Sequence, residues 1–253
     1  MISRLCMILE TSEGKKIPYQ KAVILQGIIM ERITQEFALA LHESKLHPYS
    51  QYVINRNGEN IWVVNTLNKE AYEKIIKALQ DEEFKDFKIE HDDMEVGISK
   101  KEEMVIARSD FMRKYYFNDS DKYIELAFNT PTAFKSQGMY VNYPNLELIY
   151  KSLMNKYDSS SINESLISDE LLEELVKSTR VLKYDLHSCN YSVGNSKIPS
   201  FMGNMLLRID GTQGIVNFAN MLFRFGEFSG VGIKTAMGMG SIKLKGGCKD
   251  DKR

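Results

Sequence analysis

Residues 49–65 read YSQYVINRNGENIWVVN, two runs rich in β-branched and aromatic residues on either side of Asn57-Gly58. Both turn residues tolerate positive φ angles, and an Asn-Gly pair between two such runs is a strong signal for a tight β-hairpin. We therefore expect two antiparallel strands joined by a two-residue turn. This hairpin decides the fold, because it fixes how the segments before and after it are interpreted.

The stretch before the hairpin reads as a strand followed by a long helix. Residues 2–10, ISRLCMILE, form an apolar run that is too short for a helix and typical of a buried strand. Pro18 suits a helix start, and we expect one continuous helix from about residue 19 to residue 44. Its apolar positions recur every four residues: Leu25, Ile29, Ile33, Phe37 and Leu41.

The stretch after the hairpin reads as a helix and a further strand. Asn68 is suited to cap a helix over residues 69–82, and a strand is expected near residues 87–89. The order is therefore β-α-β-β-α-β within about 95 residues, which is the ferredoxin-like arrangement. We expect a first domain of this kind over residues 1–103.

The second half of the chain repeats this order with longer insertions. Strands are expected over residues 123–129, 180–193, 197–210 and 241–245. Helices are expected over residues 146–156, 169–177 and 215–225. The fold class is therefore α+β, with two tandem ferredoxin-like (RRM-like) domains. The second domain is expected over residues 104–247, followed by a tail over residues 248–253.

The charge balance excludes one class of protein and leaves another open. The 253 residues contain 33 Lys or Arg and 34 Asp or Glu, so the chain lacks the uniformly basic surface of a non-specific nucleic-acid coater. The segment from Ser196 to Arg253 nevertheless holds nine basic and four acidic residues. The excess of positive charge in this basic quarter indicates either a binding site for a polyanion or only a charged tail that contains Lys249, Lys252 and Arg253.

Cysteine usage and hydropathy point to a reducing compartment. The three cysteines, Cys6, Cys189 and Cys248, lack C-x-x-C spacing, so neither a disulfide framework nor a structural zinc site is expected. No apolar run approaches the roughly 18 residues of a membrane span, and the start of the chain does not resemble a signal peptide. We expect a cytoplasmic protein without membrane contact, bound metal or cofactor.

The segment GVGIKTAMGMG, residues 230–240, is the most glycine-rich part of the chain. Glycines let the backbone turn sharply and present N–H groups to an anion. A P-loop is excluded because Ile233 precedes Lys234 and a strand follows, and a dinucleotide-binding loop is excluded because this loop follows a helix. A clasp for a phosphate backbone and a plain flexible connection both remain open.

The histidines are few, and two of them lie close together in the sequence. His42 and His47 flank Lys45, and such a group could act as acid and base or hold a phosphate; both imidazoles could equally be ordinary surface residues. His187 lies within an expected strand and could serve in packing. His91 belongs to a charged run that could hold a divalent cation but is more simply a solvated surface: Glu90, Asp92, Asp93 and Glu95.

Three segments together resemble a known family. Residues 230–244, GVGIKTAMGMGSIKL, resemble the signature loop of the CRISPR-associated endoribonucleases that cut precursor CRISPR RNA within its repeats. Residues 25–27 (LQG) and 41–43 (LHE) are similar to the first helix of that family and the loop after it. Residues 129–135, NTPTAFK, are similar to a run at the start of the family's second domain. The three matches occur in the family's order.

The resemblance implies a reaction and a set of catalytic residues. The family cuts repeat RNA without a metal by attack of the 2′-hydroxyl, which leaves a 2′,3′-cyclic phosphate and a 5′-hydroxyl and yields guide RNAs. His42 matches the family's histidine as general base or acid. His47 would be its partner, as a proton donor if charged or as a stabiliser of the phosphorane. Lys45 is a second candidate for stabilising the phosphorane. Met30 replaces a tyrosine of some members, so His47 or Tyr49 would supply the second group.

The resemblance also implies an RNA-binding surface and partners. The loop would contact the RNA backbone through Gly230, Gly232, Lys234, Gly238 and Gly240, with Lys197, Arg208 and Arg224 as weaker candidates. CRISPR repeat RNA is the expected partner, with other subunits of a CRISPR effector complex or a second copy of the chain as further candidates. Three alternatives remain: a non-catalytic repeat-RNA-binding subunit of a CRISPR ribonucleoprotein, a regulator that binds a nucleotide phosphate, and a metal-dependent nuclease around Asp92.

Overall fold

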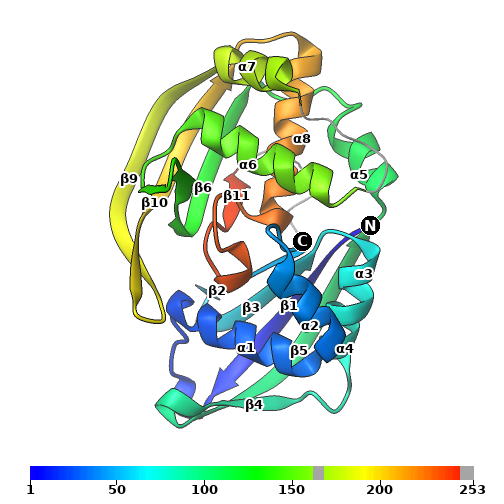
Figure 1. Cartoon of the computed structure of the whole chain (residues 1–253), viewed down its shortest axis with the longest axis vertical. Coiled ribbons are helices and arrows are strands. Elements are labelled where there is room, and N and C mark those ends of the chain that lie inside the picture. The colour runs from blue at the N-terminus through cyan, green and yellow to red at the C-terminus, as the bar shows by residue number, and fades with distance from the viewer. Residues whose placement is uncertain (162–167, 246–253) are drawn as a thin grey trace. The chain divides into compact units, whose positions relative to one another are not determined.

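The computed structural model describes residues 1–161 and 168–245 (Figure 1). The chain forms two compact units. Unit 1 comprises Met1–Ile106 together with Lys234–Gly238, and unit 2 comprises Ala107–Ile233 and the chain from Met239 onward. The tail expected over residues 248–253 lies outside the described residues.

The sheet of unit 1 has five antiparallel strands in the order β2-β3-β1-β5-β4. They are β1 (Ile2–Thr11), β2 (Tyr49–Arg56), β3 (Glu59–Thr66), β4 (Asp86–Ile89) and β5 (Met94–Ile106). The predicted hairpin is β2 and β3, and its turn residues Asn57 and Gly58 have φ angles of 52° and 86°. The order β2-β3-β1-β5 is that of a ferredoxin-like sheet, as predicted.

Helices cover one face of this sheet (Figure 1). The first pair is α1 (Ala22–Arg32) and α2 (Gln35–Glu43). The second helical stretch runs without a break through α3 (Lys69–Ala71), a π-helical turn (Tyr72–Ile76) and α4 (Lys77–Gln80). Asn68 caps it as expected, because its side chain accepts the Ala71 N–H at 2.8 Å. Short 3-10 turns complete the unit: Ser12–Gly14, Tyr19–Lys21 and Glu90–Asp92.

The single long helix predicted over residues 19–44 is wrong. Ile33 and Thr34 have extended backbones, and they separate α1 from α2. Positions four apart are rotated by about 40° in a helix of 3.6 residues per turn, so a run of such positions drifts around a straight helix. The break changes the direction of the helix axis between α1 and α2, so that Phe37 and Leu41 pack into the same core as Leu25.

The strand that completes the ferredoxin-like sheet is also not the predicted one. The segment expected near residues 87–89 forms β4, but β4 lies at the edge and β5 pairs with β1. Val96 is the one buried residue of β5, Met94 and Ile98 are partly buried against the core, and a charged run follows at residues 100–103. The apolar alternation of Met94, Val96 and Ile98 covers only the first five residues, and the charged run after it gives little signal for a strand. The domain boundary expected after residue 103 falls inside this strand.

Unit 2 contains a second sheet in the order β11-β6-β10-β9, again the ferredoxin-like arrangement. Its strands are β6 (Tyr123–Thr132), β9 (Thr179–Val193), β10 (Ser196–Ile209) and β11 (Ile242–Lys245). Its helices are α6 (Leu146–Ser159), α7 (Asp169–Ser178) and α8 (Gln213–Ser229). These are the strands and helices predicted for the second half, and the α+β fold class is confirmed.

One helix and two short strands of unit 2 were not predicted. They are the helix α5 (Arg108–Tyr115) and a small hairpin of β7 (Phe134–Ser136) and β8 (Met139–Val141). After α8, the glycine-rich segment contains one 3-10 turn, η5 (Thr235–Met237). Among the described residues, no helix is both long and apolar enough to span a bilayer. Cys6 and Cys189 are free thiols, and Cys248 lies outside the described residues.

Candidate active site

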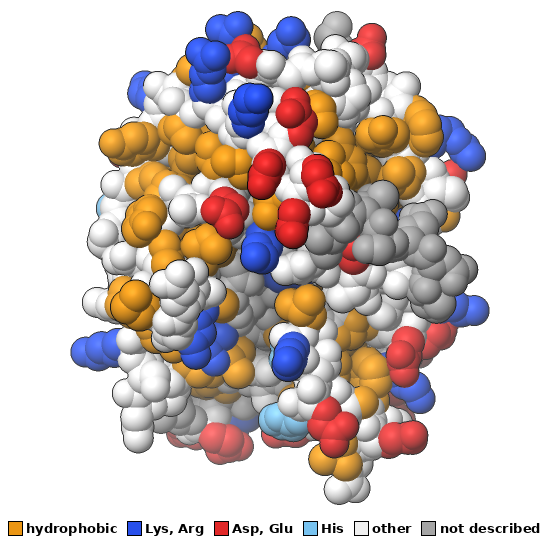
Figure 2. Space-filling view, turned by 45° about the horizontal axis from the view of Figure 1, so that its top comes forward, with side chains coloured by type: hydrophobic (Ala, Val, Ile, Leu, Met, Phe, Trp, Pro, Cys, Tyr) orange, Lys and Arg blue, Asp and Glu red, His pale blue; other side chains and the backbone are white. Residues whose placement is uncertain are grey.

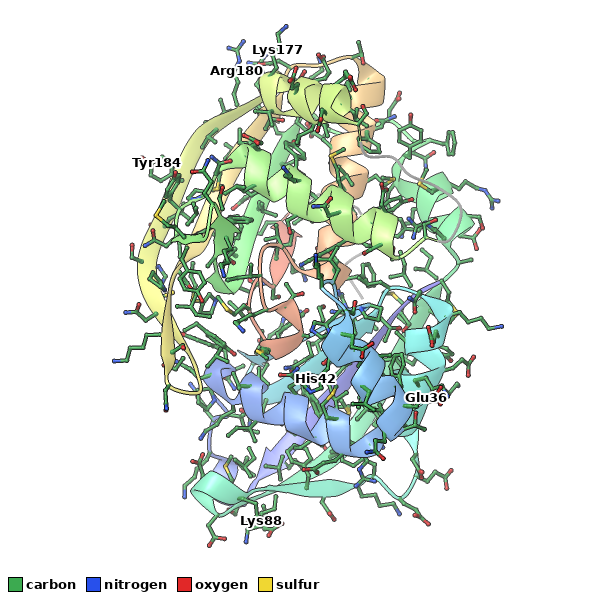
Figure 3. All side chains as sticks on the ribbon, viewed as in Figure 1. Glu36, His42, Lys88, Lys177, Arg180 and Tyr184 are labelled. Atoms are coloured by element: carbon green, nitrogen blue, oxygen red, sulfur yellow. The ribbon has the colours of Figure 1, made fainter. Side chains whose placement is uncertain are left out.

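A short loop after α2 brings two histidines together in unit 1. His42 lies in the last turn of α2, where Figure 3 labels it, and its side chain is exposed. Phe37 and Leu41 are buried and fix the helix on the core. The Ser44 N–H donates to the carbonyls of the last turn, and the Ser44 hydroxyl donates to the Leu46 carbonyl at 2.7 Å. This tight loop places the half-buried His47 at the entrance to β2.

The turn η5 packs on the same part of unit 1, against β2 and α1. Gln51 of β2 is fully buried, and its amide nitrogen donates to the Ala22 carbonyl at 2.6 Å and to the Ala236 carbonyl at 3.0 Å. Its amide oxygen accepts the Trp62 indole N–H at 2.9 Å. Gln51 therefore ties the turn to the sheet and the first helix at once.

Lys234 directly precedes this turn, and its positive charge acts on His47. It has a left-handed backbone (φ 54°) and an exposed side chain. Burial lowers the pKa of His47, and the charges of His42 and Lys234 lower it further. After burial, these two charges are the next largest causes of the shift, so His42 and Lys234 belong to the electrostatic surroundings of His47. The structure thus brings His42, His47 and Lys234 together within unit 1.

The surroundings of His47 favour its neutral form. Its Nδ1 atom is buried and has no hydrogen-bond partner among the described residues, so an added proton on it would be an unsatisfied buried donor. Nε2 is therefore the nitrogen that can meet a ligand. A neutral imidazole with a bare Nδ1 carries its hydrogen on Nε2 and donates a hydrogen bond there. This arrangement fits the role of phosphorane stabiliser better than that of charged proton donor.

Three other residues considered for the reaction lie outside this group of side chains. Tyr49 is fully buried, and burial raises its pKa to about 12 against the opposite effect of the Gln26 side chain. It can neither reach a ligand nor ionise near neutral pH, so it does not replace the missing tyrosine. Met30 packs against the hydrophobic core. Lys45 is exposed, and no hydrogen bond or ion pair to it is found among the described residues.

The glycines of the loop have conformational roles. All four candidate glycines have positive φ angles: Gly230, Gly232, Gly238 and Gly240. A Cβ atom at Gly232 would lie 2.2 Å from the Ala133 carbonyl oxygen, so only glycine fits there.

The N–H groups of the same four glycines donate within the protein. Their acceptors are the Gly226 carbonyl, the Ser152 hydroxyl, the Thr235 carbonyl and the Pro131 carbonyl, in chain order. They therefore form no open cradle for an anion, and Lys234 is the member of the set whose side chain is available to one.

Three of the six described basic residues in the basic quarter of the chain form ion pairs. Arg208 pairs with Asp210 at 2.6 Å and Lys245 with Glu125 at 3.6 Å. Arg224 is 6% exposed and pairs with Glu227 at 3.2 Å, so it is not available as a surface contact for RNA. On the face seen in Figure 2, the coloured Lys and Arg side chains are scattered among acidic ones. Lys197, Lys234 and Lys243 are exposed, and no ion pair to them is found within the described residues.

The carboxylates around Asp92 are engaged by lysines. Asp92 pairs with Lys21, and Lys88 lies 2.7 Å from Asp93 and 3.9 Å from Glu90. Within residues 1–161 and 168–245, no group of three or more His, Cys, Asp or Glu side chains is arranged to hold a metal ion. The described residues thus offer no support for a metal-dependent site at Asp92.

Sequence reasoning missed Gln51 and Trp62, the two residues that hold the turn in place. A signal was present, because Tyr49, Gln51 and Val53 alternate along β2 and share one face of the strand. A glutamine between two inward-facing apolar residues must find buried partners. The partner 185 residues further along the chain could not be read from the sequence.

Comparisons with known proteins agree with this fold. Residues 126–242 match the family model of the CRISPR-associated endoribonuclease Cas6. A Cas6 endoribonuclease of Streptococcus thermophilus is 31% identical over 224 residues, which cover 88% of this chain and 91% of the relative. A Cas6 endoribonuclease of Mycobacterium tuberculosis is 30% identical over 251 residues, which cover 96% of this chain and 78% of the relative.

Solved structures show the same fold at lower identity. A Cas6 product complex has a TM-score of 0.78 and 18% identity over 97% of this chain and 100% of that one. Thermus thermophilus Cas6 has a TM-score of 0.70 and 20% identity over 97% of this chain and 98% of that one. With sequence relatives that match along nearly the whole length of the chain, the conclusion is direct: this chain belongs to the Cas6 family of CRISPR-associated endoribonucleases.

Proposed function

We propose that this chain cuts CRISPR repeat RNA without a metal ion, by attack of a 2′-hydroxyl on the adjacent phosphate. The observation that carries the proposal is the convergence of His42, His47 and Lys234 in unit 1. The nucleophile is already part of the substrate, so the protein must supply proton transfer and stabilisation of charge. Imidazoles and an ammonium group provide both.

The roles follow from exposure and charge. His42 is exposed, and it accepts the proton of the 2′-hydroxyl as that oxygen attacks phosphorus. The bond from phosphorus to the 5′-oxygen breaks, and the leaving oxygen takes a proton from water. His47 donates a hydrogen bond from Nε2 to the phosphorane, and the Lys234 ammonium offsets its negative charge. The products are a 2′,3′-cyclic phosphate and a 5′-hydroxyl.

RNA binding rests on few cations in this proposal. Lys234 contacts the scissile region, and the exposed Lys197 and partly paired Arg208 contact phosphates elsewhere. Arg224 is left out because it is buried and paired. A small number of phosphate contacts gives a shallow dependence of affinity on salt concentration. Sequence is then read from unpaired bases and stem shape rather than from bulk charge.

The test is cleavage of a labelled CRISPR repeat from the source genome, in EDTA, by the wild type and by His42→Ala. We expect one cut with a cyclic-phosphate end, and a loss of at least about 100-fold in rate for the variant with binding retained. His187→Ala, which removes an exposed histidine of β9, is the matched control and should cut normally.

Other outcomes would revise the proposal in distinct ways. Tight binding of the repeat without any cut indicates the non-catalytic RNA-binding subunit. Cutting that stops in EDTA and returns with magnesium contradicts the metal-free mechanism. Unchanged cutting by His42→Ala overturns the assignment of His42 while keeping the activity.

A further inference from the structure

The strand β9 is an open edge of unusual length. It is the last strand of the unit 2 sheet and has fifteen residues, whereas the edge strands β4 and β11 have four each. One edge of β9 pairs with β10, and along residues 180–190 no other backbone hydrogen bond is found among the described residues. Figure 1 shows β9 as the outermost strand of its sheet. Native proteins rarely leave such an edge without a partner.

Several solvent-exposed side chains of β9 are large and apolar, although exposed positions of a monomer are usually polar. Val181, Leu182 and Tyr184 are 40%, 48% and 68% exposed. Figure 3 labels Tyr184 at the outer margin of the sheet, and Figure 2 shows hydrophobic side chains gathered along the same margin. An exposed apolar cluster beside an unpaired strand edge is typical of a surface that binds another strand.

The sequence of the strand is complementary to itself. We propose that β9 pairs with β9 of a second copy of this chain, antiparallel and centred on Tyr184, to join two four-stranded sheets. In this register each Lys183 lies opposite Asp185 of the other copy, and Leu182 lies opposite Leu186. Directly opposite residues share a face of the sheet and are in contact. Two ion pairs and two apolar pairs then form around a central pair of tyrosines.

The charged pair is available for this purpose. Lys183 and Asp185 are both exposed, and neither forms an ion pair within the described part of the chain. A register shift opposite Leu206 and Leu207 interrupts the pairing of β9 with β10 just before Lys183, and pairing is continuous from there to Val193. Residues 183–186 of the proposed segment therefore lie in the regular part of the strand, and Leu182 is the bulged residue at its start.

RNA is a less suitable occupant of this edge. Lys183 is balanced by Asp185 two residues away, and Arg180 pairs with Asp210 at 3.1 Å. The local charge is thus close to neutral, whereas RNA-binding surfaces carry a clear excess of positive charge. A second copy needs no such excess.

The test is the mass of the full chain in solution, measured by light scattering over a range of micromolar concentrations. The wild type should approach twice the 29.1 kDa of one chain as concentration rises. Lys183→Asp places two acidic residues opposite each other in each pair, and Asp185→Lys places two lysines there. Each variant alone should weaken self-association at least tenfold.

Mixing and combining these variants makes the test specific to the register. An equimolar mixture of Lys183→Asp and Asp185→Lys restores opposite charges across the pair and should form mixed dimers. The double variant Lys183→Asp with Asp185→Lys should dimerise by itself. Lys177→Asp reverses a charge on the exposed surface of α7 and should leave the dimer intact.

Several results would overturn the proposal. A wild type that stays monomeric, or a dimer that neither single variant weakens, removes the β9 pairing. A mixture that stays monomeric contradicts the register. If Lys183→Asp lowers affinity for repeat RNA at unchanged mass, the edge binds RNA instead. None of these results depends on whether the chain cuts RNA.

Discussion

The strands β2 and β9 occupy the same position in the two repeats and have opposite surroundings. Each is the second strand, in chain order, of its ferredoxin-like arrangement and lies at the edge of the sheet. β2 has eight residues, its first three are buried, and η5 packs on it. β9 has fifteen residues, most of them exposed. The repeat fixes where an edge falls, and the local sequence decides what covers it.

The difference shows how one edge can become part of a candidate active site. The inward-facing Gln51 of β2 donates a hydrogen bond to the Ala236 carbonyl of η5 and so holds the turn on the strand. The turn places Lys234 where its charge acts on His47. β9 presents apolar side chains and a self-complementary charge pattern to the outside. In the first case the edge is covered by a distant segment of the same chain. In the second case no segment of the described chain covers the edge, and the proposed cover is a second copy of the chain.

Gln51→Leu should have the largest effect on stability. The change leaves the Trp62 indole N–H and the Ala22 and Ala236 carbonyls without their partner, each at about 1–3 kcal/mol if it stays unpaired. We expect a loss of about 4 kcal/mol in the free energy of unfolding of unit 1. Urea unfolding followed by fluorescence measures it, because Trp62 is the single tryptophan of the chain.

The control for this change is Gln20→Leu, at an exposed position before α1. It should alter the free energy of unfolding by no more than about 0.5 kcal/mol. An equal and small effect of both variants would show that the turn is held on β2 by its apolar contacts alone, and β2 would then differ from β9 only in burial.

Gly203→Ala tests how closely β9 is held to β10. Gly203 has a φ angle of 127°, and a Cβ atom there would lie 2.1 Å from the Asp185 carbonyl oxygen. Because that oxygen belongs to the β9 backbone, the strand must move, and we expect a loss of about 3 kcal/mol. Circular dichroism during thermal unfolding measures it.

The matched change in the other repeat is Gly58→Ala. Gly58 also has a positive φ angle, but no atom lies within 4 Å of an added Cβ. The cost is then backbone strain alone, about 1 kcal/mol. A loss at Gly203 no larger than at Gly58 would mean that β9 can shift away from β10 without penalty.

The parts of the fold that the sequence predicted are those with local signals. The Asn57-Gly58 turn, the Asn68 cap and the apolar stripe of α8 are each encoded within a few residues. β5 escaped prediction because its partner β1 is far along the chain and its own side chains are mostly exposed. The break between α1 and α2 depends on packing rather than on a glycine or proline.

The candidate site divides in the same way. The proximity of His42 and His47 follows from one short loop, so their spacing in the sequence predicted it. The position of Lys234 depends on hydrogen bonds between Gln51 and a turn 185 residues away. The glycines looked like an anion cradle, but hydrogen bonding within the protein uses their N–H groups. Whether a donor is already occupied is a tertiary property that no local pattern records.

The smallest expected effect is on the titration of His47, and it tests whether η5 covers β2 in solution. Burial, His42 and Lys234 lower the pKa of His47 in the folded protein, whereas an unfolded histidine titrates near about 6.5. As pH falls below about 6.5, the unfolded chain binds a proton that the folded one resists, so stability declines. Lys234→Gln should raise the pKa of His47 and reduce that decline. The control is Lys45→Gln, which removes an exposed lysine from the loop that carries His47 and should change neither the pKa nor the decline.

NMR titration of the histidine ring measures the pKa, and urea unfolding across this pH range measures the stability. Equal shifts in both variants would mean that only general surface charge acts on His47, and the edge of β2 would be as open as that of β9.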